Sequence, residues 1–272
     1  MDLISTKNIK ELLAKYNAKP SKGLGQNFLI DKNIFQKIID AGNLKPDDIV
    51  LEVGPGIGNL TLKLAEKVKK VIAVEKDKLM IEILKETVAS HKNIEVVNAD
   101  ILKHSLPKNY KVVANIPYYL TSPLIRKLLE DKNPPLEIVL MIQKEVAQRI
   151  CAKPPKMNLL ASSVQFYARA EIISYVSKNC FWPSPKVDSA IIKIVPENKF
   201  DVAPDLFFKV VKAGFSQPRK QLVNNLTILK NLNGVKLDKY SVAAWLLKNN
   251  LQPNARAQTL TINDWINLAK NF

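Results

Sequence analysis

The sequence predicts an α/β protein with a seven-stranded, mostly parallel sheet and a small all-helical C-terminal domain. Short β-branched runs alternate with segments of helical periodicity up to about Phe200, which is typical of βαβ units with helices on both faces of a sheet. Beyond that point the strand pattern stops. Apolar residues make up 47% of the 272 residues, which is enough for one large core and one small core.

The N-terminal segment predicts a short amphipathic helix followed by a basic, flexible lead. From Ser5 to Asn17, apolar residues recur at helical spacing and lysines occupy the other faces. Proline and glycine interrupt this pattern between residues 19 and 28. The first packed helix is therefore expected at Lys32–Ala41.

Seven strands are expected in the larger domain. The first five are Ile49–Val53, Val71–Val74, Ile94–Val97, Lys111–Ala114 and Ile138–Ile142, with helices at Leu60–Glu66 and Lys78–Ser90. The last two strands, Ala170–Val176 and Ala190–Val195, have no long helix between them. This spacing indicates an antiparallel hairpin at one end of the sheet.

The C-terminal part predicts only helices, at Pro204–Gly214, Lys220–Leu229, Ser241–Lys248 and Ile262–Asn271. The last of them opens with Thr261-x-x-Asp264, a variant of the capping box. We expect the domain boundary near Asn198–Asp201. The expected domains are residues 1–199, which include the basic helix and lead at 1–30, and residues 200–272.

Charge and cysteine content narrow the class of protein. Lys and Arg outnumber Asp and Glu by 41 to 25, a net charge of +16, which favours a partner that carries phosphates over a merely solvated basic surface. Two distant cysteines and two histidines, Cys151, Cys180, His91 and His104, form no metal set or disulfide framework. With no leader-like start and no long apolar run, we expect a cytoplasmic protein without metal or membrane insertion.

A glycine-rich loop follows the first strand of the sheet. Glu52-Val53-Gly54-Pro55-Gly56-Ile57-Gly58 places three glycines at G-x-G-x-G spacing, where the backbone can approach a ligand closely. The dinucleotide pattern G-x-G-x-x-G is not met. Glu75 ends the second strand about 20 residues later, where a carboxylate can accept ribose hydroxyls. An NAD enzyme could use the same acid, so Glu75 indicates a ribose rather than one cofactor.

The next two strands also end in polar residues. Asp100 follows the third strand and can accept a hydrogen bond from an adenine amino group, while Asn115-Ile116-Pro117-Tyr118 follows the fourth. The Asn115 side-chain oxygen and the Ile116 carbonyl can together orient a weakly nucleophilic exocyclic amine, because Pro117 stiffens the loop. Tyr118 offers a flat face for a stacked base.

Together these motifs resemble one family. The matching segments are Lys22-Gly23-Leu24-Gly25-Gln26-Asn27-Phe28-Leu29, Glu52 to Gly56, Asn115 to Tyr118, Met141-Ile142-Gln143-Lys144-Glu145-Val146 and Phe181-Trp182-Pro183-Ser184-Pro185-Lys186-Val187-Asp188-Ser189. They resemble the small-subunit ribosomal RNA adenine N6,N6-dimethyltransferases, S-adenosylmethionine enzymes that dimethylate two adjacent adenines near the 3′ end of that RNA. The resemblance runs from about Lys19 to the C-terminus and implies a class I (Rossmann-like) methyltransferase fold.

The resemblance also implies the site residues. Cofactor binding is implied for Gln26, Asn27, Leu29, Glu52, Gly54, Gly56, Glu75, Lys76, Asp100, Ile101 and Asn115. Within this set the lead closes over the cofactor, the glycines line its methionine end, Glu75 binds its ribose and Asp100 its adenine. Catalytic roles are implied for Asn115, Ile116, Pro117, Tyr118 and Phe181. Phe181 is implied to flank the target base opposite Tyr118, whereas core packing is the preferred reading of Trp182.

We expect direct in-line transfer from the cofactor to adenine N6, without a strong general base, on an RNA base splayed out of its stack. Phosphate contacts are expected from the basic N-terminal segment, the Lys144–Lys156 region, Lys186, Arg219, Lys220 and Arg256. The expected partner is small-subunit rRNA or a 30S-type particle, and the expected state is a monomer.

The sequence departs from the family pattern at two places. Residues 218–220 read Pro218-Arg219-Lys220 in place of an Arg-Arg-Lys run, and the loop Lys153–Asn158 lacks Gly-Arg-Leu-Ser.

Three alternative functions are less consistent with the sequence. The large-subunit rRNA adenine methyltransferase that confers macrolide resistance is disfavoured by Pro55 and by the string Gln143-Lys144-Glu145. A non-catalytic RNA-binding or transcription factor on the same fold is disfavoured by the intact set of site residues. An NAD-dependent oxidoreductase is disfavoured by the glycine spacing and by the lack of a histidine suited to hydride transfer.

Overall fold

The computed structural model describes residues 3–21, 23–197, 202–232 and 234–272. The chain divides into two compact units. The sheet unit comprises Met1–Ala147 and Arg169–Pro196, and the helical unit comprises Gln148–Ala168 and Glu197–Phe272. The boundary expected near Asn198–Asp201 lies outside the described residues and stays a prediction, but the segment Gln148–Ala168 groups with the C-terminal helices.

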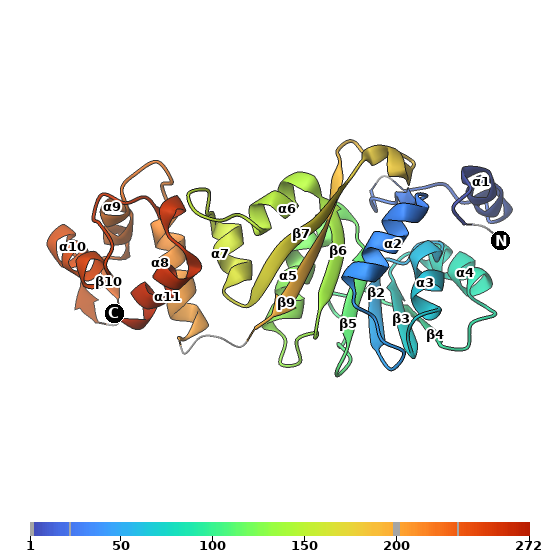
Figure 1. Ribbon diagram of the computed structural model, residues 1–272, viewed down its shortest axis with the longest axis horizontal. Helices are drawn as coiled ribbons and strands as arrows, with labels where there is room; N and C mark the ends of the chain where they lie inside the picture. Colours follow the sequence, from blue (N-terminus) through green and yellow to red (C-terminus); the bar gives the residue numbers. More distant parts are fainter. Residues whose placement is uncertain (1–2, 22, 198–201, 233) are drawn as a thin grey trace. The chain divides into compact units, whose positions relative to one another are not determined.

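All seven predicted strands are present in one sheet with the order β4-β3-β2-β5-β6-β9-β7 (Figure 1). Their bounds are β2 Ile49–Val53, β3 Lys70–Glu75, β4 Ile94–Asn98, β5 Lys111–Asn115, β6 Ile138–Gln143, β7 Ala168–Val176 and β9 Ser189–Pro196. Neighbouring strands from β4 to β6 pair in parallel, and β6 pairs antiparallel with β9. Strand order reverses between β2 and β5, which is where open α/β sheets bind ligands.

Both faces of the sheet are covered. Successive strand residues point to opposite faces, yet Val50, Leu51, Val112 and Val113 are all fully buried. One face packs against α2 (Lys32–Ala41) and α3 (Asn59–Ala65), whose apolar residues share a cluster with Val50 and Val113. Such two-sided burial explains why the strands read as continuous β-branched runs rather than as alternating ones.

The remaining helices of the sheet unit are α1 Thr6–Lys15, α4 Lys78–Thr87, α5 Thr121–Glu130 and α6 Lys144–Ile150, which runs into the helical unit. Short 3₁₀ turns, η1 Tyr118–Leu120 and η2 Lys178–Cys180, complete it. Helices α1 to α4 match the prediction within a few residues, and α5 and α6 were not predicted. The α2 start is fixed by Asp31, whose side chain accepts hydrogen bonds from Asn33 N and Ile34 N.

Two short strands in the described part of the sheet unit lie outside the main sheet. β1 (Phe28–Leu29) pairs antiparallel with β8 (Phe181–Trp182), so that Leu29 stands opposite Phe181. The prediction of a flexible lead up to Phe28 is therefore wrong at its end. Phe28 and Leu29 are buried, and apolar burial together with strand pairing fixes this part of the lead.

The helical unit contains α7 Leu159–Gln165, α8 Pro204–Gly214, α9 Leu222–Leu226, α10 Lys239–Lys248 and α11 Ile262–Lys270, with 3₁₀ turns η3 Thr227–Leu229 and η4 Ala257–Thr259. Its core is aromatic: the rings of Phe166 and Phe207 stack at 4.1 Å, and Trp265 is fully buried. The predicted capping box at Thr261 and Asp264 is confirmed. The described part of the unit is helical as predicted, apart from one small two-stranded sheet that was not predicted. This sheet pairs β10 (Asn231–Leu232) with β11 (Val235–Lys236).

No helix in the described part of the chain is both long and apolar enough to cross a membrane.

Candidate active site

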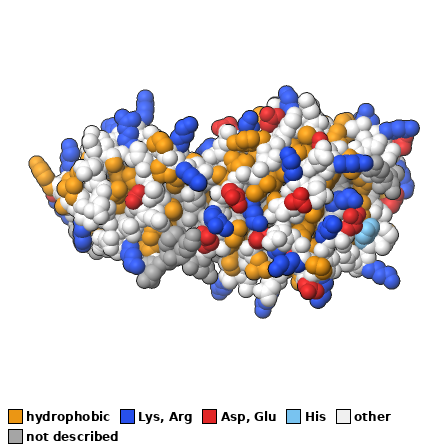
Figure 2. Space-filling model, viewed as in Figure 1, with side chains coloured by type: hydrophobic (Ala, Val, Ile, Leu, Met, Phe, Trp, Pro, Cys, Tyr) orange, Lys and Arg blue, Asp and Glu red, His pale blue; other side chains and the backbone are white. Residues whose placement is uncertain are grey.

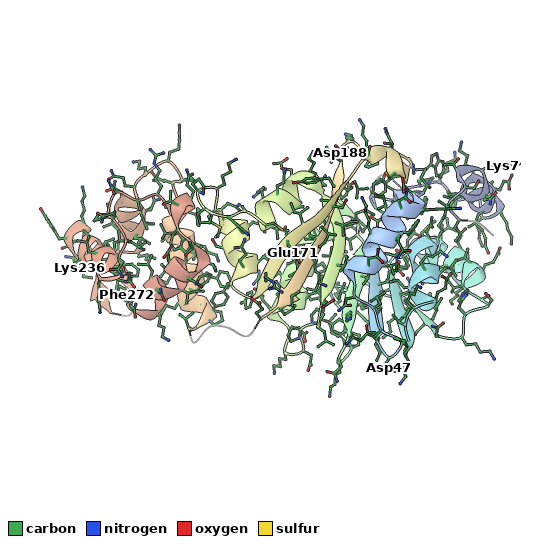
Figure 3. The ribbon with its side chains drawn as sticks, in the orientation of Figure 1. Lys7, Asp47, Glu171, Asp188, Lys236 and Phe272 are labelled. Carbon is green, nitrogen blue, oxygen red and sulfur yellow. The ribbon has the colours of Figure 1, made fainter. Side chains whose placement is uncertain are left out.

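The candidate site lies at the carboxyl ends of the parallel strands, around the point where strand order reverses. One cavity there is lined by Gly54, Gly56, Glu75, Asn115 and Tyr118, together with residues of the lead. A second cavity, lined by Glu75, Asp100 and Ile101, adjoins it through Pro117. Figure 3 labels Asp188, just before β9, at this end of the sheet, and Asp47, just before β2, at the opposite end.

The three glycines of the loop all have positive φ. Gly54, Gly56 and Gly58 have φ values of +68°, +58° and +93°, which side chains with a Cβ rarely adopt. A Cβ on Gly54 would lie 3.3 Å from Pro117 Cδ, and one on Gly56 would lie 3.2 Å from Phe28 Cε1. The glycines therefore permit close contact between this loop, the Asn115–Tyr118 loop and the lead.

Glu75 organises the loops around it through its carboxylate. Its Oε1 accepts hydrogen bonds from Lys76 N at 2.7 Å and Asp77 N at 2.9 Å, and its Oε2 accepts one from Gly56 N at 3.2 Å. Burial raises the pKa of Glu75, while the backbone donors lower it. Each carboxylate oxygen has more than one acceptor direction, so Glu75 can hold the glycine loop and still accept from a ligand.

Asp100 and Lys76 form an ion pair beside the second cavity. Lys76 Nζ donates to Asp100 Oδ2 at 3.0 Å, and Leu102 N donates to Asp100 Oδ1 at the same distance. The hydrogen bond from Lys76 holds the pKa of Asp100 below its usual range. Asp100 is thus an ionised acceptor at neutral pH. Ile101 beside it is buried and contributes an apolar wall.

Glu52 also lines the first cavity and is only 1% exposed. Neither its Oε2 nor Thr61 Oγ1 has a hydrogen-bond partner among the described residues. Burial raises the pKa of Glu52 to about 8. Glu52 is therefore mostly a neutral acid at pH 7.

The lead is held over the glycine loop by several polar contacts. Asn115 Nδ2 donates to Asn27 O at 3.3 Å, and Gln26 Nε2 donates to Asp77 Oδ2 at 2.8 Å. Asn59, directly after the loop, donates from Nδ2 to Leu29 O at 3.0 Å. No sequence pattern points to Asp77 or Asn59, because their partners lie far away in the chain.

The side-chain oxygen of Asn115 is available, since no group in the described part of the chain donates to it. Asn115 ends β5 and is partly buried, and Ile116, which follows, is buried. Pro117 packs against both Gly25 and Gly54. The Asn115 oxygen and the backbone at Ile116 are thus carried by a loop that packing holds in place.

Two aromatic residues predicted for the target base lie at the same cavity. Tyr118 and Phe181 both line it, although Phe181 is only 4% exposed and shares a core cluster with Leu29 and Phe35. The ring of Trp182 stacks on that of Phe28 at 6.4 Å. A third aromatic residue, Tyr119, was not predicted for the site; it is 57% exposed and lines both cavities.

Metal-binding geometry is absent from the described residues: no group of three or more His, Cys, Asp or Glu side chains could hold an ion there. Cys151 and Cys180 form no disulfide with the described residues. The polar groups of the site are instead carboxylates, amides and backbone groups.

Comparison with known sequences gives matches over nearly the whole chain. A sequence model of the family described as "Ribosomal RNA adenine dimethylase" matches residues 17–270. A protein of Alkaliphilus oremlandii named ribosomal RNA small subunit methyltransferase A is 44% identical over 287 aligned positions, which cover 100% of this chain and 99% of that protein.

Two solved structures resemble the whole fold. A dimethyladenosine transferase from Plasmodium falciparum superposes with a TM-score of 0.78 at 32% identity, over 89% of this chain and 95% of its own. The 23S rRNA methyltransferase ErmE superposes with a TM-score of 0.74 at 27% identity, over 90% of this chain and 99% of its own. The predicted Rossmann-like methyltransferase fold is confirmed.

Proposed function

Because this chain belongs to the ribosomal RNA adenine dimethylase family, we propose that it dimethylates N6 of two adjacent adenines near the 3′ end of small-subunit rRNA. As a member of that family it is an rRNA adenine dimethyltransferase. The observation that carries the proposal in detail is the meeting of Glu75, Asp100 and Asn115 at adjoining cavities on one edge of the sheet.

S-adenosylmethionine is the proposed methyl donor, and the residues present fit it. Close backbone approach at Gly54 and Gly56 suits its methionine end, Glu75 its ribose hydroxyls, and the ionised Asp100 with buried Ile101 its adenine. When bound, it supplies an electrophilic methyl group on a sulfonium. Gln26, Asn27 and Leu29 would then cover the site, and Lys76 would keep Asp100 ionised.

The target amine is proposed to bind at Asn115. The free Asn115 side-chain oxygen and the Ile116 carbonyl would accept hydrogen bonds from adenine N6, which orients its lone pair. No strong general base is required, because the amine proton becomes acidic only as the new C–N bond forms. Tyr118 on one side and Phe181 on the other would hold the flipped base.

Phosphate contacts are proposed mainly for the helical unit. That unit holds 14 Lys and Arg against five Asp and Glu, although it is the smaller of the two. Arg219 and Lys220 are exposed in the turn after α8. Figure 2 shows Lys and Arg side chains spread over the face in view, with fewer Asp and Glu among them. Such a surface suits the backbone of a folded RNA.

The proposed substrate is small-subunit rRNA, alone or in a 30S-type particle, and the enzyme is proposed to act in the cytoplasm as a monomer. One observation favours a second candidate, methylation of large-subunit rRNA, because ErmE shares the fold over nearly all of its length. The small subunit is preferred since the relative with 44% identity carries that name.

Incubation with labelled methyl donor tests the proposal. Unmodified small-subunit and large-subunit particles are treated in parallel, and the rRNA is digested for nucleoside analysis. We expect dimethyladenosine in small-subunit rRNA alone. Label in large-subunit rRNA would favour the second candidate, and label in neither would refute the proposal. Asn115→Ala is the matched variant: it should abolish turnover and leave the affinity for the cofactor, measured by calorimetry, nearly intact.

A further inference from the structure

One buried hydroxyl near the site takes no part in the function described so far. Ser189 begins β9, is completely buried, and its Oγ lies 2.9 Å from the hydroxyl oxygen of Tyr118. The two residues are 71 positions apart in the sequence. A buried hydroxyl without a partner is costly, so this contact is the main polar interaction available to both groups.

Ser189 stands on a rigid part of the sheet. It lies opposite Gln143 in the antiparallel pair of β6 and β9, and the neighbouring Asp188 carbonyl accepts a hydrogen bond from Lys144 N at 3.0 Å. Asp188 Oδ1 also accepts from Lys178 N at 3.1 Å. Sheet pairing and these loop contacts therefore fix the position of the Ser189 hydroxyl before any ligand binds.

Tyr118 is fixed at both of its ends. At the backbone, Thr121 Oγ1 donates to Tyr118 O at 3.0 Å, and Thr121 is itself buried. At the far end of the ring stands Ser189. Burial raises the pKa of Tyr118, so its hydroxyl stays protonated at neutral pH and can donate or accept. The adjacent Tyr119 differs: it is exposed, and its hydroxyl makes no hydrogen bond to the described residues.

From this geometry we infer that Ser189 is a positioning residue for the target base, because its hydroxyl holds the Tyr118 ring in the orientation that the base stacks on. The inference rests on the proposed role of Tyr118. A ring held at two points loses little conformational freedom when a base arrives, whereas a ring held only at its backbone must be ordered during each binding event.

The test is a double-mutant cycle on the full-length enzyme with unmodified small-subunit particles. Ser189→Ala and Tyr118→Phe each remove one partner of the hydrogen bond. Each should lower kcat/KM for the particle by roughly 3- to 10-fold, as loss of one neutral hydrogen bond does. The double variant should be no worse than either single variant, and cofactor affinity by calorimetry should stay within about twofold.

Ser162→Ala is the matched control, since Ser162 is a fully buried serine in α7 whose Oγ donates to Asn158 O. It should lower the melting temperature about as much as Ser189→Ala and leave kcat/KM unchanged. A fall in kcat/KM that tracks melting temperature in both serine variants would overturn the inference, as would additive effects in the cycle.

Tyr118→Ala separates the inference from the proposed function. If Tyr118→Ala strongly reduces methylation and Ser189→Ala has no effect, the inference fails and the proposed function stands. If Tyr118→Ala leaves methylation unchanged, the proposed stacking role fails, and the inference falls with it. If Ser189→Ala does not fold, Tyr118→Phe reports on the same hydrogen bond from the other side.

Discussion

Replacing Glu75 with glutamine removes one charge and one acceptor from the centre of the cofactor site. The carboxylate accepts three backbone N–H groups, of Lys76, Asp77 and Gly56, and the bond from Gly56 is the longest at 3.2 Å. A glutamine side chain retains one oxygen. We expect it to keep the two shorter bonds, so that its NH₂ group faces the Gly56 N–H and that bond is lost.

The cost follows from this geometry. The replaced oxygen can no longer accept a hydrogen bond from a ribose hydroxyl, and a hydrogen bond to a charged group contributes about 1.5–3 kcal/mol. Each 1.4 kcal/mol corresponds to a tenfold change in affinity, so we expect Glu75→Gln to weaken binding of S-adenosylmethionine by roughly 10- to 100-fold. The Gly56 N–H group left without an acceptor destabilises the folded protein itself. A fall in melting temperature of a few degrees should therefore accompany the loss of affinity.

Calorimetric titration with S-adenosylmethionine measures this effect directly. Glu82→Gln is the matched control, since Glu82 is an exposed glutamate on α4 and its substitution changes the charge equally. The control should bind within about twofold of the original protein. Equal affinities of Glu75→Gln and Glu82→Gln would show that Glu75 neither holds the glycine loop nor binds the ribose.

Three further perturbations give distinct signatures. Burial raises the pKa of Glu52 in the folded protein to about 8, against 4.5 for a free glutamate. Between these two values the folded protein keeps a proton that the unfolded chain loses, so the free energy of unfolding falls as pH rises from 4.5 to 8. Glu52→Gln should flatten that fall by at most about 1.4 kcal/mol per pH unit in denaturant titrations, and an unchanged slope would contradict a neutral Glu52. Gly54→Ala, which places a Cβ 3.3 Å from Pro117 at φ +68°, should weaken cofactor affinity several-fold, whereas Gly23→Ala, whose Cβ would meet only Ser21 Oγ at 3.9 Å, should not. Exchanging both Arg219 and Lys220 for glutamine should reduce the slope of log affinity for rRNA against log salt by about 1.4–1.8, and an unaltered slope would exclude them from phosphate contact.

The larger strands and helices were predictable from local patterns. Strands β2, β5 and β6 are buried on both faces and read as β-branched runs, whereas the edge strand β4 is only partly buried. The turn residues between the strands mark their ends. The neighbouring strands β9 and β7 at one end of the sheet were also predicted, since no long helix separates them in the sequence. Amphipathic helices such as α2 appeared with their bounds correct, because Asp31 caps the first turn.

Features that depend on distant partners could not be predicted. The pair β1 and β8 has only two residues in each strand, too few for any periodicity, and exists because Leu29 and Phe181 meet across the chain. The same holds for the hydrogen bond between Asn59 and Leu29 and for that between Tyr118 and Ser189. The glycine loop, Glu75 and Asp100 were predicted correctly to share one edge, because strand ends of a parallel sheet converge there.

The chain passes between its two compact units three times, since Gln148–Ala168 belongs with the C-terminal helices while Arg169–Pro196 returns to the sheet. A single C-terminal truncation therefore cannot remove the whole helical unit and leave the sheet unit intact. A fragment ending before α8 would retain Phe166 without Phe207, the ring on which it stacks. Anyone grafting the RNA-contacting part of one relative onto the catalytic part of another must transplant two separated stretches together, or leave an aromatic core half built.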